Sequence, residues 1–359
     1  MIFRQSLLRE FSATALGVFV VLLAITLTTQ FIRFLGQAAS GTLVVDAVLA
    51  MLGFSALSHL SVLLSLTLFV SVLMTLTRSY RDSEMVVWFS SGVSLLRWVR
   101  PVLTFSLPMV ITIALLSLFL SPWAVRLAQE FKVQLDTRDD VSGVAPGVFR
   151  ESKRAERVFF VEQVDGDAST IANVFVRSTQ HQREGIMVAR TGFQETAPNG
   201  DRFLVLLNGS RYEGTPGAAD YRITKFERYA LRIEAFEAKR ELPTAKASDT
   251  IDLLRAPTRA AMGELTWRVG LPVSALILSL LAIPLAFVNP RAGRSLNLML
   301  ALLVYVVYSN LMSMLQAWVT QGRIGVGTGM VGVHLAMLVA LAALFYRRLA
   351  IYPFWRWLR

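Results

Sequence analysis

Six windows without a charged side chain constrain this chain more than any other feature. They cover residues 11–32, 47–77, 101–125, 269–290, 295–322 and 324–346, and each has 22 residues or more. About 20 apolar residues in a helix are enough to cross a hydrocarbon core of ~30 Å. The sequence therefore predicts six membrane-spanning helices, which excludes an ordinary soluble enzyme.

The long segment between the third and fourth windows, roughly residues 126–265, is charged but electrically balanced. It contains 21 Lys and Arg and 21 Asp and Glu, so the formal net charge of +11 belongs entirely to the membrane part. A nucleic-acid-binding protein would concentrate its basic residues on the soluble module. Nucleic acid is therefore not an expected partner. The absence of cysteine does not decide the redox compartment.

Arginines are distributed unevenly between alternate loops, and this predicts the orientation in the membrane. Both termini and the loops on their side carry twelve: Arg4, Arg9, Arg78, Arg81, Arg97, Arg100, Arg291, Arg294, Arg347, Arg348, Arg356 and Arg359. The opposite short loops carry only Arg33 and Arg323. We therefore expect cytoplasmic termini and an outward-facing central segment. The run 11–32 is too long for the apolar region of a signal peptide, so it is interpreted as a retained helix.

The central segment is predicted to be all-β. Short runs rich in β-branched and aromatic residues cover 157–161, 172–176, 186–190, 202–207 and 221–224, and Tyr229, Leu231 and Ile233 alternate with charged residues. Turn signals occur at Asp165-Gly166, Asn199-Gly200 and Asn208-Gly209. This spacing favours a sandwich, a barrel or a jelly roll. Residues 242–268, with Pro243 and Pro257, then form a linker.

The chain contains no phosphate-binding loop ending in Gly-Lys-Ser/Thr, and all its lysines lie in the central segment. No cofactor is expected on this chain, and any ATP and magnesium must be used by a separate ATPase. His59, His181 and His334 are scattered, without carboxylates at ligand spacing, so neither a metal site nor a catalytic triad is expected. We interpret His59 and His334 as hydrogen-bonded groups in a helix bundle rather than as proton relays.

A short amphipathic segment follows the second window. Ser83 can cap a helix that contains Met85, and Gly92 can end it. The segment is either an interfacial hairpin or a docking helix for a cytoplasmic partner. Glu84, an acid in a basic loop, favours docking because a carboxylate can pair with arginine on a partner.

Arg33 lies directly after the first window, on the side where positive charges are scarce. It is interpreted as an interfacial anchor or as a cation that meets an anionic amphiphile. The same two interpretations apply to Arg323. Pro108, Pro272 and Pro284 lie inside spans and are expected to kink or loosen them.

In this order, several segments resemble the permeases of lipopolysaccharide-export ABC transporters, the LptF/LptG family. They are Arg33-Phe-Leu-Gly36, Leu73-Met-Thr-Leu76, Ser83-Glu-Met85, Gly92-Val-Ser94, Phe160-Val-Glu-Gln-Val-Asp-Gly166, Arg211-Tyr-Glu-Gly-Thr215, Tyr221-Arg-Ile-Thr224, Glu264-Leu-Thr-Trp-Arg268 and Asn289-Pro-Arg-Ala-Gly-Arg294. The resemblance covers nearly the whole chain and is greater to the LptF branch, with the LptG-type sister permease as the alternative.

The resemblance implies a six-span α-helical inner-membrane protein of Gram-negative bacteria, with an inserted periplasmic β-jelly roll. The implied domains are 1–125, three spans with a coupling helix near 82–92; 126–265, the jelly roll and its linker; and 266–359, three further spans. The implied partners are a homologous LptG permease, a cytoplasmic LptB ATPase dimer, single-span LptC, the periplasmic bridge LptA and lipopolysaccharide itself.

The family's motifs also imply roles for individual residues. Glu84, with Ser83, Met85 and Gly92, corresponds to the coupling helix that inserts into the ATPase. Arg33 corresponds to the basic rim that contacts lipid A. Related sequences often carry a lysine three residues earlier, where this chain has Gln30, so the rim charge is reduced here.

Two other function classes fit the sequence less well than transport driven by a partner ATPase. A membrane receptor with a periplasmic β sensor would need a sizeable cytoplasmic output module, and the cytoplasmic segments are short. A secondary transporter usually carries charged residues at the midplane, which the six windows lack. The resemblance instead implies an apolar cavity, open between spans one and five of two permeases, that another subunit's ATP hydrolysis squeezes.

Overall fold

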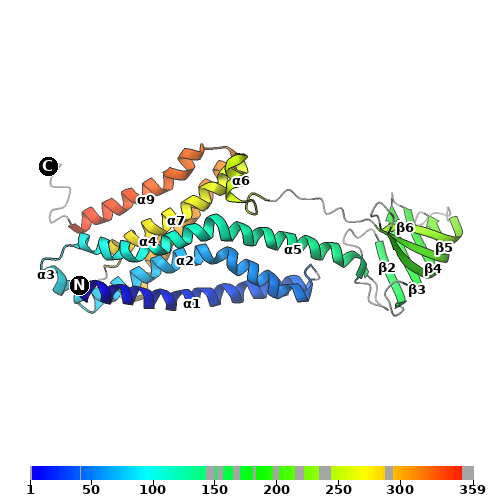
Figure 1. Ribbon diagram of the computed structural model, residues 1–359, viewed down its shortest axis with the longest axis horizontal. Coiled ribbons are helices and arrows are strands. Elements are labelled where there is room, and N and C mark those ends of the chain that lie inside the picture. The colour runs from blue at the N-terminus through cyan, green and yellow to red at the C-terminus, as the bar shows by residue number, and fades with distance from the viewer. Residues whose placement is uncertain are drawn as a thin grey trace. The chain divides into compact units, whose positions relative to one another are not determined.

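The computed structural model describes residues 2–40, 42–142, 150–151, 157–164, 170–180, 183–196, 202–214, 222–233, 244–287 and 294–349 (Figure 1). The chain divides into two compact units. The membrane unit comprises Met1–Gln129 and Pro243–Arg359, and the β unit comprises Glu130–Leu242. Several predicted features, including the turns at Asp165-Gly166 and Asn199-Gly200, His181, Pro243 and Arg291, lie outside the described residues.

Helices make up the described membrane unit. In chain order they are α1 (Ile2–Ala39), the 3₁₀ turn η1 (Val45–Ala47), α2 (Val48–Arg81), α3 (Glu84–Ser90), the 3₁₀ turn η2 (Leu95–Trp98), α4 (Val99–Leu115), the π-helical turn η3 (Leu116–Leu120), α5 (Ser121–Ser142), α6 (Thr250–Arg255), α7 (Arg259–Leu285), α8 (Arg294–Gln321) and α9 (Val326–Leu349). Helix α5 continues from the membrane unit into the β unit.

Six helical segments are long and apolar enough to cross a membrane, which confirms the predicted architecture. The third span differs most from its charge-free window, because α4, η3 and α5 form one apolar segment over Leu95–Leu135 and the helix continues to Ser142. Charged residues beyond Arg126 end the window but not the helix, because Glu, Lys, Gln and Leu are good helix formers. The linker predicted over 242–268 likewise contains α6 and the first turns of α7.

Helices α2 and α7 form the centre of the membrane unit, whereas α1, α8 and α9 are largely exposed. Helix α7 packs against α2, α4, α8 and α9. Helix α2 buries a series of small hydroxyl residues at near-helical spacing: Ser61, Ser65, Ser71, Thr75 and Ser79. Such residues let helix backbones approach closely in a membrane. Pro108 lies within α4, and Pro272 and Pro284 lie within α7, and both helices continue through them.

The β unit contains one antiparallel sheet whose strands follow each other in chain order. The strands are β1 (Arg150–Glu151), β2 (Arg157–Val164), β3 (Thr170–Gln180), β4 (Arg183–Thr196), β5 (Arg202–Gly214) and β6 (Arg222–Ile233). Its buried apolar cluster consists of Val174, Val176, Met187, Ala189, Leu204 and Leu206. The described strands therefore form an up-and-down meander with one apolar face.

Along one row that crosses this sheet, the residues of neighbouring strands do not pair. On β4, Ala189 pairs with Gly209 and Thr191 with Leu207, so the ladder passes over Arg190 and Asn208. Asn173 on β3 and Glu227 on β6 interrupt their ladders on the same line. Asn173 and Asn208 both have φ of +52°. The register is the same on both sides of this row, so no residue is inserted and one pair is left out of each ladder. We call this row, which contains Asn173, Arg190, Asn208 and Glu227, the crease.

The crease corrects two predictions made from the sequence. Asn208-Gly209 is not a turn but lies inside β5, and the predicted runs belong, over 222–224 and 229–233, to one strand, β6. Asn tolerates positive φ inside a strand as well as in a hairpin turn. The apolar alternation shifts at the crease, because Phe226 and Tyr229 pack on the same cluster although they are three residues apart.

Substituting Gly209 tests the crease. A Cβ at this position would collide with the ring of Phe226 and would lie 2.5 Å from the carbonyl oxygen of Val188. We expect Gly209→Ala to destabilise the β unit by about 1–3 kcal/mol, measured as faster limited proteolysis of this unit in the full-length protein. The neighbouring substitution Ser210→Ala adds no atom and serves as the control. Equal proteolysis of the two variants would contradict the crease geometry.

Candidate coupling and substrate sites

The short helix α3 is bounded by two residues with left-handed backbone. Ser83 has φ of +61° and Gly92 has φ of +82°. Gly92 ends the helix as predicted: its N–H donates to the carbonyl of Phe89 (3.0 Å), and that of Val93 donates to Trp88 (3.1 Å), as in a Schellman motif. Ser83 occupies the N-cap position, but its hydroxyl makes no capping hydrogen bond. Its positive φ, costly for a non-glycine residue, instead sets the direction in which α3 leaves α2.

Helix α3 has one buried residue and an apolar exposed face. The Met85 side chain is 1% exposed and packs in the main core of the membrane unit. Val86 and Val87 are 64% and 66% exposed, and Phe89 is also exposed. Exposed apolar side chains beside charged ones are typical of a protein-binding surface. This surface is suited to contact another protein.

Arg78, at the end of α2, links α3 to α1. Its guanidinium contacts both carboxylate oxygens of Glu10 at 2.8 Å, and it lies 3.1 Å from Glu84 and 3.2 Å from Asp82. Arg78 and Glu10 were not predicted from the sequence as members of the cluster around Glu84. One signal was present: Glu10 is the only acid in the first 45 residues.

The pKa of Asp82 is shifted by the arginines of this cluster. The hydrogen bond from Arg81, assisted by the positive charges of Arg81 and Arg78, lowers the pKa of Asp82 below its ordinary value. Asp82 is therefore ionised at neutral pH, and its attraction for the two arginines is lost only when the pH falls through this lowered pKa.

The candidate substrate residues do not form one site within this chain. Arg33 is exposed and Gln30 is partly buried, one turn apart on α1, which packs mainly on α2 and α4. Arg323 is exposed in the connection between α8 and α9, directly after Gly322, whose φ is +72°. Helices α8 and α9 pack on α7.

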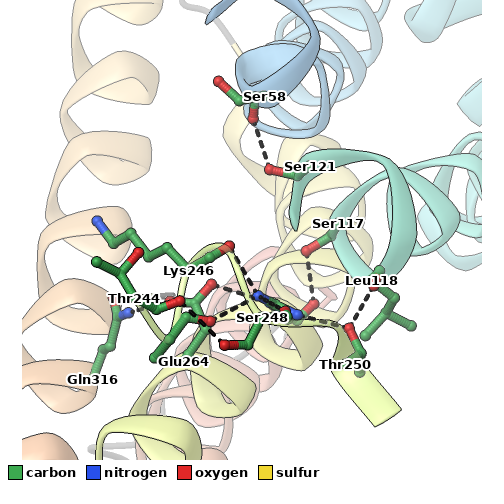
Figure 2. Close-up of polar contacts among 12 residues, drawn as sticks. Ser58, Ser117, Leu118, Ser121, Thr244, Lys246, Ser248, Thr250, Glu264 and Gln316 are labelled. Carbon is green, nitrogen blue, oxygen red and sulfur yellow. Dashed lines mark hydrogen bonds and ion pairs between the residues drawn. The ribbon is translucent and has the colours of Figure 1, made fainter. Parts of the chain in front are cut away.

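A buried charged pair that the sequence analysis did not consider as a site lies on α7. Arg268 is 2% exposed, and its Nε lies 3.0 Å from Glu264, one turn earlier. The second carboxylate oxygen of Glu264 accepts a hydrogen bond from Gln316 on α8 (3.2 Å). Figure 2 shows Glu264 and Gln316 beside residues of the segment 244–250. A Glu and an Arg four residues apart at the start of an apolar helix were the available signal.

Two of the three histidines lie among described residues, and both are hydrogen-bonded. Nδ1 of His59 lies 2.7 Å from the carbonyl oxygen of Ser55, and Nδ1 of His334 lies 2.6 Å from the hydroxyl of Tyr308. In the part of the chain that the structure describes, no group of three or more His, Asp or Glu is placed to hold a metal ion.

The role of Arg78 can be tested by amide hydrogen exchange. We expect Arg78→Ala to speed exchange in residues 84–90 about two- to fivefold, because half-exposed ion pairs contribute only modestly. Arg81→Ala is the matched control, since among the described contacts Arg81 pairs only with Asp82. Unchanged exchange in Arg78→Ala would show that Met85, not the ion pairs, positions α3.

Comparisons with known proteins support this architecture. The family model of the lipopolysaccharide export system permease LptF/LptG matches residues 5–347. The chain is 30% identical over 311 residues to the lipopolysaccharide export system permease protein LptF of Escherichia coli K12, covering 86% of this chain and 84% of that protein. The proteins of the same name from Escherichia coli O157:H7 and Shigella flexneri match equally. The chain therefore belongs to the LptF/LptG family of lipopolysaccharide export permeases.

Proposed function

We propose that this chain is one permease subunit of an ABC transporter that extracts lipopolysaccharide from the outer leaflet of the inner membrane and passes it toward the outer membrane. The observation that carries this proposal is the family match over residues 5–347. The arrangement of three spans, an antiparallel sheet with an apolar face, and three further spans supports it. Neither a receptor nor a secondary transporter is favoured by this match.

Energy for the proposed transport comes from a separate ATPase that binds ATP and magnesium, and this chain is a non-catalytic subunit without a cofactor. Each CH₂ of an acyl chain is stabilised in the bilayer by ~0.8 kcal/mol, so extraction of a molecule with several chains needs an external energy source. The absence of a Gly-Lys-Ser/Thr loop from the sequence supports this division of labour.

The proposed partners are the LptG-type sister permease, the LptB ATPase dimer, single-span LptC and the periplasmic bridge LptA. The exposed apolar faces of α1 and α8 support a cavity shared with the sister permease and open between spans one and five. Leu16, Val21 and Ile25 on α1 are each more than half exposed. We assign the termini to the cytoplasm and the β unit to the periplasm from the arginine distribution.

Helix α3 is the proposed contact with the ATPase. Met85 fixes it to the core, Val86, Val87 and Phe89 offer an apolar surface, and Glu84 presents a half-exposed carboxylate beside it. A carboxylate at the edge of an apolar contact can pair with an arginine of the partner and set the orientation of docking.

The coupling role predicts that Glu84→Ala loses the ATPase from the purified complex or uncouples it. We expect export to fall at least about tenfold, since a charge-assisted hydrogen bond at an interface is worth ~1.5–3 kcal/mol. Asp82→Ala, in the same loop and also bound to Arg78, is the control. Normal export together with normal ATPase association in Glu84→Ala would exclude this role.

The substrate role predicts that Arg33→Glu weakens lipopolysaccharide binding and leaves assembly intact. A reversed charge at the cavity mouth repels the anionic headgroup, and we expect binding about five- to tenfold weaker, measured by photocrosslinking to α1. Arg255→Glu changes an exposed arginine on α6 and should leave binding unaltered. If Arg33→Glu binds like the unsubstituted protein, Arg33 is an interfacial anchor only.

A further inference from the structure

The chain leaves the membrane unit through α5 and re-enters it at residues 244–250, and these two connections are bonded to each other. Gln129 donates to the hydroxyl of Thr244 (2.8 Å), and Arg126 lies 2.9 Å from Asp249. Nearer the core, the hydroxyl of Thr250 donates to the carbonyl of Leu118 (Figure 2). The returning segment therefore lies antiparallel to the helical connection that it contacts.

The guanidinium of Arg268 on α7 also binds the returning segment. Nη2 of Arg268 contacts three backbone carbonyl oxygens, and Nη1 donates to the hydroxyl of Thr250 (2.8 Å). The three carbonyls belong to Ala245 (3.1 Å), Lys246 (3.2 Å) and Ser248 (3.0 Å). Residues 245–250 therefore curve around the end of the Arg268 side chain.

The same cluster reaches α4–α5 and α8. The carbonyl of Arg268 accepts from the hydroxyl of Ser117, which is itself buried in η3 (3.0 Å). Glu264 holds Nε of Arg268 and accepts from Gln316. In a π-helical turn the regular i→i−4 pattern is interrupted, and such turns occur frequently at functional sites. Three elements, α7, η3 and α8, thus meet the returning segment at Arg268 and Glu264.

A buried ion pair is a poor means of adding stability, because desolvation offsets much of its attraction. What a planar guanidinium with several acceptors does supply is geometry, since it fixes the direction of each acceptor. Here the acceptors are carbonyls of an irregular segment, which has no helix or sheet of its own between residues 244 and 249. The cluster therefore fixes where this segment leaves the spans.

We propose that Arg268 is a positioning residue that fastens both chain connections of the β unit to α7, so that movements of the spans during the transport cycle reach the β unit. The inference rests on the proposed function and concerns a step within it. Without the Arg268 side chain, the returning segment would keep its contacts with α5 and η3 and the packing of Ala245 beside α7, but it would lose the hydrogen bonds that Arg268 donates to it. Movement of α7 would then no longer displace both connections together.

Transport by the whole complex in proteoliposomes tests this role. We expect Arg268→Gln to assemble and hydrolyse ATP, while lipopolysaccharide delivered per ATP falls about three- to tenfold, the range over which residues in a coupling network act. Arg255→Gln is the control, because Arg255 is exposed and forms only a long contact (4.0 Å) with Asp252. Thr250→Val removes two hydrogen bonds without removing a charge, and it serves if Arg268→Gln does not assemble. Delivery at the control level in both variants overturns the proposal.

Covalent fastening distinguishes positioning from a general structural role. The chain has no cysteine, so Gln129→Cys and Thr244→Cys introduce the only thiols of this subunit, and a short bis-maleimide can join them. Because this cross-link joins the segment to α5 and not to α7, we expect delivery to stay low in cross-linked Arg268→Gln and to be unchanged when Arg268 is present. Full rescue of Arg268→Gln by the cross-link would show that attachment of the segment to α7 is not needed, and this result, or a block in the parent protein, overturns the proposal.

If the proposed function is wrong, the experiments give a different result. If the unsubstituted complex delivers no lipopolysaccharide, the function is wrong whatever the variants do. Hydrogen exchange of residues 244–250 still reports on the fastening, and we expect it to be faster in Arg268→Gln and slowed again by the cross-link. Unchanged exchange in Arg268→Gln contradicts the inference independently of transport.

Discussion

A bilayer core supplies no hydrogen-bond partner, so the polar groups of the membrane unit must be satisfied by the protein itself. The hydroxyls of Ser71, Thr266 and Ser274 donate to carbonyls three or four residues earlier in the same helix. The buried guanidinium of Arg268 has five acceptor residues. Polar groups are thereby concentrated in α2 and α7, and the outer helices can remain apolar and present their faces to lipid or to another subunit.

Helix α2 connects the two polar clusters of the membrane unit. Near its end, Arg78 binds Glu10 and Glu84, and about five turns earlier the carbonyl of Ser58 accepts from Ser121 of α5. Helix α2 runs without interruption between these two points. Displacement of α3 by a partner would therefore be carried along α2 toward the beginning of α5, where Thr250 and Ser117 join the Arg268 cluster.

The six spans could be predicted because a run of 22 residues without charge rarely forms anything but a membrane helix, and the ends of the spans could not. Arg126 and Arg268 bounded the predicted windows, yet α5 continues past the first and α7 contains the second. In the β unit, the period of two located the strands but failed at the crease, where Asn173 and Asn208 each shift the alternation by one residue. A local pattern does not distinguish a residue with positive φ inside a strand from a turn residue, because both use the same backbone conformation.

In the candidate sites, local structure could be predicted from the sequence, but contacts between distant residues could not. A short helix could be predicted around Ser83, Met85 and Gly92, because the start and end of a helix are determined by residues close together in the sequence. The partners of Glu84 could not, because Glu10 is distant in the chain and becomes a neighbour only when α1 packs on α2. Arg268 is the stronger case: its acceptors are mostly backbone carbonyls, which every residue carries, so no residue type in the segment 244–250 could have indicated them. Burial of a charge at the start of an apolar helix, rather than any motif, is the property that makes such a cluster recognisable once the fold is known.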